Sequence, residues 1–291
     1  MSLMTDWQGV KGKQVLITGA TAGIGLAAAE ALAARGAKIA FVARSEERAR
    51  EPLARIKAAA GSAPVDVLIG DLSSQGSVRA LADQALQRYE RIDVLINNAG
   101  AVYPKRQLTE DDIELTWAVN HLAPFLLTTL LLDRLKTSAP ARIITTSSGA
   151  HKIGTIPFDD FEAAKSFSSF KRYGATKLAN ILFTRELASR LEGTNVTASC
   201  FHPGTVATDF GRHSALLSAF MKLAWLFLRS PKKGAETLVW LADSREAAGQ
   251  NGGYYYDMKR MEPAPAGNDD DAAQKLWEAS ERQTIASSRF A

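Results

Sequence analysis

The chain has few of the residues that would point to an extracellular or metal-dependent protein. Cys200 is the only cysteine, so an intramolecular disulfide is excluded, and its apolar surroundings VTASCF predict a small core residue rather than a nucleophile. The histidines are too far apart in sequence to indicate a metal site: they are His121, His151, His202 and His213. The N-terminus shows no signal or transit peptide. We therefore expect a cytoplasmic protein that binds no metal.

Long hydrophobic runs are also scarce. The most apolar segment, ALLSAFMKLAWLFL at residues 215–228, is short for a membrane span and contains Lys222. We therefore predict no transmembrane segment. The same composition suits peripheral contact with a membrane or a cover over a lipophilic site. Residues 1–8 are expected to be a flexible N-terminus or a tag.

Neither sign of charge dominates the sequence. Lys and Arg number 35 against 31 Asp and Glu, which gives a net charge of +4. The basic residues are scattered among acidic ones and are not interleaved with aromatic residues, so nucleic acid is not an expected partner. The apolar fraction of 46% is high enough for a large core, and the length fits one large domain or two small ones.

What the chain does have is a regular alternation of apolar runs with helical patterns. The helical patterns lie between runs that are continuously apolar, which is typical of parallel strands buried on both faces and joined by right-handed crossovers. The runs are 13–20, 38–44, 65–72, 91–100, 141–148 and 195–204, and the helices are 25–37, 45–60, 77–89, 110–135 and one that includes 171–183. This pattern predicts an α/β protein with a single-domain Rossmann fold and helices on both faces of a doubly wound sheet.

The alternation fades after residue 204. An apolar helical segment, a helix that begins at SPKKGAETLVWLA and a last strand at 252–257 are expected to complete the chain. The last strand brings the mostly parallel sheet to seven strands. We expect one domain over residues 1–291, in which residues 205–230 add a substrate lid.

The first strand runs into the glycine-rich turn TGATAGIG at residues 18–25. Glycines after a strand and before a helix let the backbone approach a pyrophosphate at the positive helix N-terminus. The spacing is not G-x-G-x-x-G, and no GK[ST] follows, so this is not a phosphate loop of the ATPase kind. A turn without a ligand is the alternative, which its place after the first strand disfavours. The expected cofactor contacts here are Gly19, Thr21, Ala22, Gly23, Ile24 and Gly25.

The end of the second strand indicates which dinucleotide binds. The strand ends in Ala43-Arg44-Ser45, and no acidic residue precedes Glu46. A free ribose 2′-hydroxyl usually meets an acidic side chain at this place, whereas a 2′-phosphate is met by an arginine. Arg44 therefore favours NADP(H) over NAD. The alternative interpretation is that Arg44 binds no cofactor and is a solvated residue at the start of a helix.

Polar residues and glycines close the remaining strands. Since parallel strands end at the same edge of a sheet, these residues are expected to lie together at the edge where ligands bind. They are Asp71 and Leu72 after the third strand, Asn98, Ala99 and Gly100 after the fourth, Ser148 after the fifth, and Pro203 and Gly204 after the sixth. The Asp71 carboxylate is expected to meet the amino group of the adenine.

A tyrosine and a lysine lie one turn apart in KRYGATKLANILF, residues 171–183. Tyr173 and Lys177 are four positions apart, so their Cβ atoms lie ~5–6 Å from each other on one helix face. A cation beside a phenol favours the phenolate, which predicts a lowered tyrosine pKa. Taken alone, such a pair is more often amphipathic packing with the lysine head in water.

Taken together and in this order, the glycine turn, NNAG, the serine-rich strand end, Y-x-x-x-K and PG resemble the short-chain dehydrogenase/reductase family. VNHLAPFLLT, SSGAHKIG, YGATKLANILFTREL and HPGTVATDF are similar to its retinol dehydrogenase-like branch. The resemblance runs from about residue 12 to residue 285. It implies an NADP(H)-dependent oxidoreductase that transfers hydride between nicotinamide and a lipophilic aldehyde, ketone, retinal-like carbonyl or alcohol.

The resemblance also implies roles for single residues. Tyr173 is the general acid/base, Lys177 lowers the Tyr173 pKa and holds the nicotinamide ribose, and Ser148 binds the substrate oxygen. Asn120 kinks the long helix and holds a water in a proton relay. Further cofactor contacts are implied for Asn98, Ala99, Gly100, Pro203, Gly204, Val206 and Thr208, and for Tyr173 itself. Relatives pair through helices that include 110–135 and 172–191, which implies a homodimer or homotetramer.

The remaining polar residues near these motifs have simpler interpretations. Ser147 is expected to be structural, and His151 to be a hydrogen-bonded loop residue rather than a substrate contact. Four cations are expected to face solvent: Lys152, Lys165, Lys171 and Arg172. Two other functions remain open: a carbon–carbon double-bond reductase of the protochlorophyllide reductase type, and a non-catalytic NADP-binding sensor or scaffold. The intact set of Asn120, Ser148, Tyr173 and Lys177 disfavours a scaffold.

Overall fold

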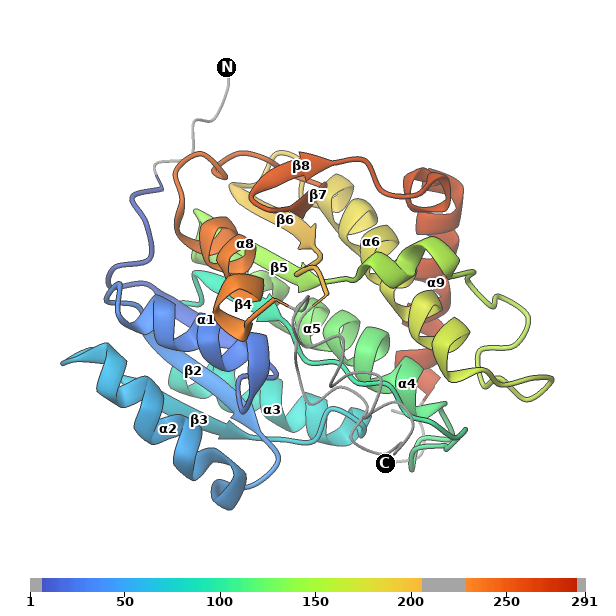
Figure 1. The fold of residues 1–291 in the computed structure, drawn as a ribbon, viewed down its shortest axis with the longest axis horizontal. Coiled ribbons are helices and arrows are strands. Elements are labelled where there is room, and N and C mark those ends of the chain that lie inside the picture. The colour runs from blue at the N-terminus through green and yellow to red at the C-terminus, as the bar shows by residue number, and fades with distance from the viewer. Residues whose placement is uncertain (1–6, 206–228, 287–291) are drawn as a thin grey trace.

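The computed structural model describes residues 7–205 and 229–286. An eight-stranded sheet crosses the molecule in the order β3-β2-β1-β4-β5-β6-β7-β8 (Figure 1). All neighbouring strands pair in parallel except β7 and β8, which are antiparallel. The strands are β1 (Gln14–Ile17), β2 (Lys38–Ala43), β3 (Val65–Ile69), β4 (Val94–Asn97), β5 (Ala141–Thr146), β6 (Val196–Phe201), β7 (Gly253–Tyr256) and β8 (Lys259–Met261). The prediction of a doubly wound, mostly parallel Rossmann sheet is confirmed.

The eighth strand is the one element of the sheet that was not expected. Asp257 and Met258 both adopt positive φ angles, of 49° and 60°. Two such residues form the tight turn that suits a hairpin, so the chain returns along β7 directly after it. The three residues of β8 are exposed and carry no apolar alternation, which is why the strand was not recognised in the sequence.

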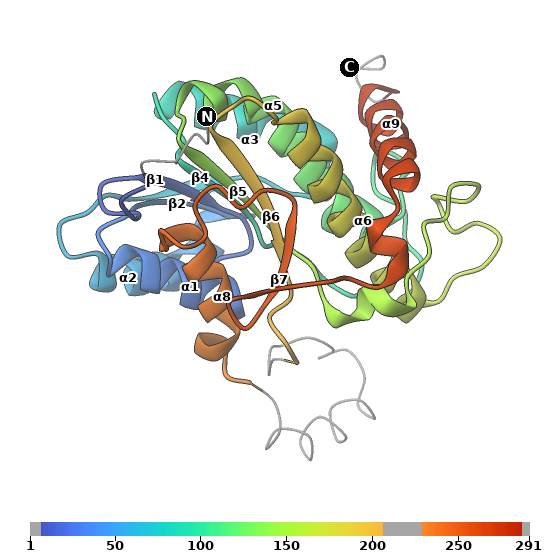
Figure 2. The same ribbon diagram turned by 90° about the horizontal axis from the view of Figure 1, so that it is seen from above.

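Helices cover both faces of the sheet (Figure 2). One face carries helices whose small and branched side chains pack with Phe41, Ile39 and Val94: α1 (Gly23–Ala33), α2 (Glu46–Ala60) and α8 (Pro231–Asp243). The other face carries α3 (Gln75–Arg88), α5 (Ala123–Thr137) and α6 (Ser169–Arg190). Ser230 caps α8 and Pro231 occupies its first turn, so the helix predicted from this point is confirmed.

The long helix that ends with α5 begins later than predicted and is irregular. Residue 110 lies in a loop, in which Leu108 and Glu114 form an isolated bridge. Glu114 then caps the helical run by accepting hydrogen bonds from the backbone N–H groups of Thr116 and Trp117, both at 3.0 Å. The run consists of α4 (Leu115–Trp117), a π-helical turn (Ala118–Leu122) and α5. It is long and apolar enough to cross a membrane, but its most apolar window is 72% buried, as is usual for a core helix.

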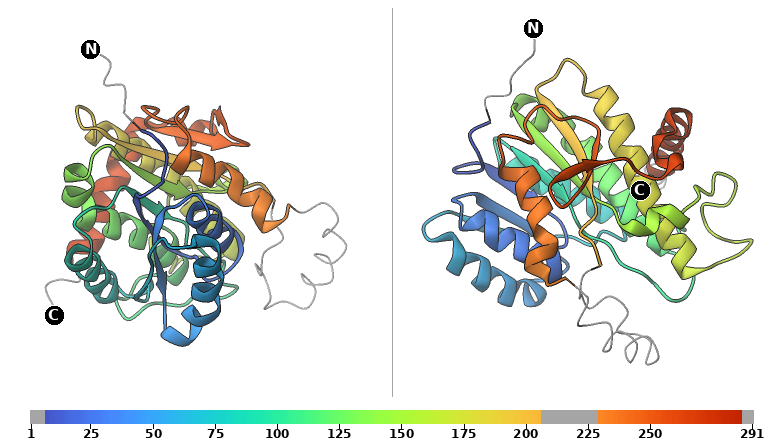
Figure 3. Two further views of the ribbon diagram at one scale, coloured as in Figure 1. Left: turned by 90° about the vertical axis from the view of Figure 1, so that its left-hand side faces the viewer. Right: turned by 45° about the horizontal axis from the view of Figure 1, so that its top comes forward.

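A C-terminal helix, α9 (Asp270–Ala286), was not predicted; the expectation that the strand at 252–257 completes the chain was wrong. It lies alongside α6 (Figure 3). Trp277 packs edge-on to Phe125, with ring centroids 4.9 Å apart, and stacks on Phe183 at 5.9 Å. Part of the α5 and α6 surface through which relatives are expected to pair is therefore buried within this chain. The predicted lid, except for Thr205, Arg229 and Ser230, lies outside the described residues.

Candidate active site

The reversal of strand order places two loops opposite each other at one edge of the sheet. β1 lies between β2 and β4, and the crevice beyond such a switch point is where dinucleotides bind. Gly19 has φ +70°, and a Cβ built on it would lie 2.7 Å from the Cα of Ala99. A Cβ on Gly25 would lie 2.2 Å from the carbonyl oxygen of Gly19. Only glycine lets the turn after β1 approach the loop after β4 this closely.

Asn98 holds these two loops together. Its Nδ2 donates to the carbonyl oxygens of Thr18 and Gly19, at 3.2 and 3.1 Å. The Thr18 hydroxyl accepts from the backbone N–H groups of Asn98 and Ala99, both at 3.1 Å. The Asn98 side chain therefore shapes the glycine turn. Thr18 belongs to the same arrangement, although the sequence offered no signal that separates it from its neighbours.

The residues at this edge fit a bound dinucleotide. Helix α1 begins at Gly23 with no side-chain cap from Ala22 and no acidic residue in its first turn. Its first N–H groups are thus left for an anion, at the positive end of the helix. Arg44 is exposed directly after β2 and forms no ion pair with a carboxylate in the described ranges. Asp71 lies two residues after the end of β3 at the same edge, and its Oδ1 accepts hydrogen bonds from the backbone N–H and the hydroxyl of Ser73.

Three candidate catalytic side chains converge where β5 meets α6. Ser148 follows β5, and its Oγ accepts a hydrogen bond from the N–H of Ala150 at 3.2 Å. Tyr173 lies close enough to the Ser148 side chain for Ser148 to lower the Tyr173 pKa, against the larger effect of burial. Lys177 Nζ lies 5.5 Å from the centroid of the Tyr173 ring and donates to the carbonyl oxygen of Thr146 at 3.0 Å. The structure therefore brings together the serine, tyrosine and lysine that the sequence pattern singled out.

Asn120 joins this group from the π-helical turn. Its Oδ1 accepts from the N–H of Ala101 at 2.8 Å, and its Nδ2 donates to the Ala101 carbonyl at 2.9 Å and to the Thr176 hydroxyl at 3.2 Å. A Cβ on Gly100 would lie 3.2 Å from Lys177 Nζ and 3.4 Å from Asn120 Oδ1. Gly100 therefore lets both side chains reach the loop after β4. The irregular helix expected at Asn120 is confirmed, and the water relay stays a prediction.

Burial sets the pKa values of the tyrosine and lysine. It raises the pKa of Tyr173 to about 12, against the opposing effect of Ser148. It lowers the pKa of Lys177 to about 8. The prediction that Lys177 lowers the Tyr173 pKa is wrong in this structure, because the Lys177 ammonium is directed to the Thr146 carbonyl and desolvation disfavours the phenolate. Tyr173 is held as a neutral phenol, the form that donates a proton.

Replacing Lys177 with Met is expected to stabilise the fold by about 3 kcal/mol near neutral pH. The lysine pKa has its ordinary value of 10.5 in the unfolded chain and is about 8 in the folded protein, and each unit of difference corresponds to about 1.4 kcal/mol. The Thr146 carbonyl keeps a second donor, Asn180 Nδ2, at 3.1 Å. Urea unfolding of both proteins measures the effect.

The titration of Lys177 determines how the stability gained in the Lys177→Met variant depends on pH. Between pH 8 and 10.5 the unfolded wild-type chain binds more protons than the folded one, so wild-type stability rises with pH through that window. The advantage of the Lys177→Met variant should therefore shrink as the pH is raised from about 7 to about 10. A variant that is no more stable than wild type at neutral pH would contradict the burial penalty assigned to Lys177.

The other sequence predictions at this edge have mixed outcomes. The Ser147 hydroxyl donates to the Lys177 carbonyl at 2.7 Å, in agreement with a structural role. Gly204 adopts φ +83° after β6, where its missing side chain leaves room for Arg229. Val206 and Thr208 lie outside the described residues. Lys152, Lys165 and Lys171 are exposed, as predicted.

Arg172 was expected to face solvent, and this was wrong. Its side chain is 4% exposed and forms an ion pair with Glu114, which is 0% exposed, at a distance of 2.6 Å. The guanidinium also stacks over Trp117, 5.0 Å from the ring centroid, and donates to the Phe161 carbonyl. This ion pair joins the run that carries Asn120 to the helix that carries Tyr173. Sequence reasoning missed it because Glu114 is 58 residues away and no local pattern links the two.

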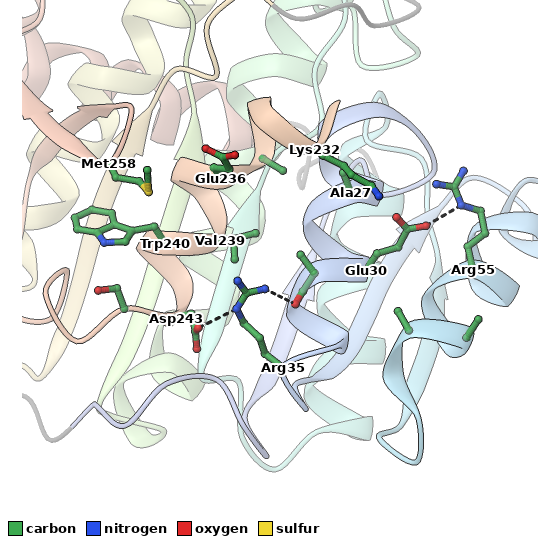
Figure 4. Close-up of a pocket in the computed structure, with 15 residues that line it drawn as sticks. Ala27, Glu30, Arg35, Arg55, Lys232, Glu236, Val239, Trp240, Asp243 and Met258 are labelled. Carbon is green, nitrogen blue, oxygen red and sulfur yellow. Dashed lines mark hydrogen bonds and ion pairs between the residues drawn. The ribbon is translucent and has the colours of Figure 1, made fainter. Parts of the chain in front are cut away.

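A separate groove of about 840 Å³ lies between α1, α2 and α8 (Figure 4). Two ion pairs cross it, Arg35 to Asp243 at 3.1 Å and Arg55 to Glu30 at 2.7 Å. None of the candidate site residues lines this groove. The candidate active site is therefore defined by the side chains that converge at the sheet edge.

Comparison with known proteins agrees with this arrangement. A family model described as short chain dehydrogenase matches residues 13–216. The chain belongs to the short-chain dehydrogenase family. It is 44% identical to human retinol dehydrogenase 14 over 287 residues, which cover 93% of this chain and 85% of that protein. It is also 42% identical to mouse retinol dehydrogenase 12, with coverage of 93% and 86%.

Solved structures of similar fold include family members with a bound nucleotide. A short chain dehydrogenase from Burkholderia cenocepacia in complex with NADP has a TM-score of 0.66 and 27% identity, with 83% of this chain and 96% of that chain covered. A Mycobacterium paratuberculosis protein has a TM-score of 0.78 and 29% identity, with 96% of both chains covered. The chain is thus a retinol dehydrogenase-like oxidoreductase that acts on CH–OH groups, with a nicotinamide cofactor and a small-molecule substrate.

Proposed function

We propose that this protein is an NADP(H)-dependent oxidoreductase that transfers hydride between nicotinamide and a lipophilic carbonyl or alcohol, with Tyr173 as the general acid/base. The observation that carries the proposal is the convergence of Ser148, Tyr173 and Lys177 where β5 meets α6, with Lys177 Nζ 5.5 Å from the centroid of the Tyr173 ring. These groups lie at the edge of the sheet where β1 and β4 form the cofactor crevice. Cys200 is not a candidate nucleophile, because it is buried and burial raises its pKa to about 12.

The protein groups have distinct tasks in the reducing direction. The bound nicotinamide supplies the hydride to the carbonyl carbon. Ser148 donates a hydrogen bond to the carbonyl oxygen and so stabilises the negative charge that develops there. Tyr173, a neutral phenol at its raised pKa of about 12, transfers its proton to the same oxygen and completes the alcohol. In this proposal Lys177 returns a proton to Tyr173, through a relay in which Asn120 holds a water.

Two observations support the finer points of the proposal. Arg44 at the end of β2, with no acidic residue before Glu46, suits a 2′-phosphate and therefore NADP(H). The similarity to proteins named retinol dehydrogenase supports a lipophilic substrate.

We also propose a cytoplasmic location, based on the single buried cysteine. Cell fractionation would test this location, and recovery of the protein in a membrane or secreted fraction would contradict it.

A carbonyl panel tests the function. Short and long aliphatic aldehydes, ketones, a retinal-like aldehyde and a conjugated enone are each incubated with enzyme and either NADPH or NADH. We expect faster loss of the reduced cofactor with NADPH, and with long-chain aldehydes. Product analysis of the enone decides which bond is reduced, so a saturated ketone as the sole product would favour the double-bond reductase instead. Absence of turnover on every compound would contradict the proposal.

A further inference from the structure

His151 links the candidate catalytic serine to a distant part of the chain. It lies in the short 3-10 helix η2 (Gly149–Ile153), and its side chain is buried. Its Nδ1 lies 2.8 Å from the carbonyl oxygen of Ser148, and its Nε2 lies 3.0 Å from the backbone nitrogen of Ala264, 113 residues along the chain. The ring therefore bridges the loop after β5 and the segment that leads from β8 to α9.

These two contacts determine where the imidazole carries its proton. The Ala264 N–H can only donate, so Nε2 must be the accepting nitrogen. A neutral ring then carries its proton on Nδ1, which donates to the Ser148 carbonyl. The same carbonyl also accepts from the backbone N–H of His151 at 3.1 Å. Two hydrogen bonds from one residue thus hold the Ser148 backbone.

The surroundings of the ring keep it in this form. Tyr254 from β7 packs edge-on against it, with ring centroids 5.2 Å apart and the hydroxyl 3.4 Å from Nδ1. His202, after β6, stacks on the same tyrosine at 5.9 Å. Burial lowers the His151 pKa, the Ser148 carbonyl opposes this, and the nearby Lys152 lowers it further. The ring is therefore neutral at physiological pH.

We propose that His151 is a positioning residue, which fixes Ser148 by bridging the Ser148 carbonyl to the Ala264 amide. The inference rests on the proposed function, in which Ser148 binds the substrate oxygen. His151 need not touch the substrate. Protonation would place an N–H on Nε2 against the Ala264 N–H and break the bridge, so turnover should fall when the ring becomes charged.

Three substitutions separate the two halves of the bridge. His151→Phe keeps the ring shape but neither hydrogen bond. His151→Asn retains an N–H that reaches the Ser148 carbonyl, and Lys152→Gln, at an exposed neighbour, is the control. We expect His151→Phe to lower kcat about 10- to 100-fold, the range in which misplacement of a catalytic group acts. His151→Asn should recover part of this loss. Lys152→Gln should have a kcat near that of wild type.

Two further readouts distinguish positioning from general stability. NADPH affinity should stay within about twofold of wild type in all variants, because the cofactor crevice lies at β1 and β4 and none of the substituted residues belongs to it. The acid limb of the wild-type kcat profile, below the ordinary histidine pKa, should disappear in His151→Phe. A folded His151→Phe variant with wild-type kcat and an unchanged acid limb would overturn the proposal.

A nuclear magnetic resonance measurement tests the bridge independently of turnover. Protein labelled with ¹⁵N at histidine, with His151→Phe for assignment, should show the Nδ1–H tautomer for His151 and slow exchange of the Ala264 amide. The Nε2–H tautomer or a rapidly exchanging Ala264 amide would overturn the bridge. If wild type reduces no carbonyl at all, the proposed function fails, while this measurement still decides whether the bridge exists.

Discussion

Replacing Tyr173 with Phe is expected to lower carbonyl turnover by about 10²- to 10⁴-fold, the contribution typical of a positioned general acid. The change removes only the hydroxyl, which is held as a neutral phenol by the burial that raises its pKa to about 12. Without the hydroxyl, the carbonyl oxygen has no proton donor when negative charge develops on it during hydride addition to the carbonyl carbon. Steady-state rates with NADPH and the best substrate of the panel measure the loss.

The matched control is Tyr89→Phe. Tyr89 is a buried tyrosine that directly follows α3, and its hydroxyl donates to Asp66 of β3 at 3.2 Å. This variant should keep wild-type turnover, and both variants should keep wild-type affinity for NADPH. The reduction rate of wild type should also show no loss from tyrosine ionisation at neutral pH, because the donating form persists below the raised pKa. A Tyr173→Phe variant with more than about half of wild-type turnover would exclude Tyr173 as the acid.

Replacing Arg172 with Met is expected to destabilise the fold by about 3–5 kcal/mol, the range for breaking a buried ion pair. The substitution leaves the Glu114 carboxylate 0% exposed and without its cation. It also removes the stacking on Trp117 and the donor to the Phe161 carbonyl. Urea or thermal unfolding measures the effect.

The double variant with Glu114→Gln provides a stringent check. Gln removes the stranded charge, and its single carbonyl oxygen can still accept from one of the two N–H groups, those of Thr116 and Trp117, that Glu114 accepts through its two oxygens, so it should recover part of the stability lost in Arg172→Met. The surface control is Arg55→Met, which breaks the pair with Glu30, where the arginine side chain is 49% exposed. Exposed pairs contribute about 1 kcal/mol or less. Equal losses for Arg172→Met and Arg55→Met would contradict the structural role of the buried pair.

Much of the fold could be predicted from the sequence because its strands are continuous apolar runs. All seven predicted strands are present, since a strand buried on both faces carries its signal within a few consecutive residues. Helix α9 has no such signal. Its apolar residues Trp277 and Leu276 find their partners on α5 and α6, far away in the chain. The start of the long helix at Leu115 likewise depends on Glu114, which was not recognised as a cap.

The candidate site could likewise be predicted from the sequence only in part. Tyr173 and Lys177 could be paired from their spacing, and Ser148 from its place after a strand, because helix geometry and strand order are local properties. The pKa of Tyr173 could not be predicted, because it depends on burial by the whole fold rather than on the neighbouring lysine. Arg172 could not be placed in the core without knowing that Glu114 lies beside it.

The most direct test of the central claim is a calorimetric titration with NADPH and NADH of wild type, of Arg44→Ala and of the neighbouring control Arg48→Ala. Both arginines are exposed, but only Arg44 stands directly after β2. We predict that wild type binds NADPH about 10- to 100-fold more tightly than NADH, as one charge-assisted contact of about 1.5–3 kcal/mol allows. Arg44→Ala should lose this preference, and Arg48→Ala should keep it. Binding of neither nucleotide to wild type would contradict the account of the sheet edge as a cofactor site.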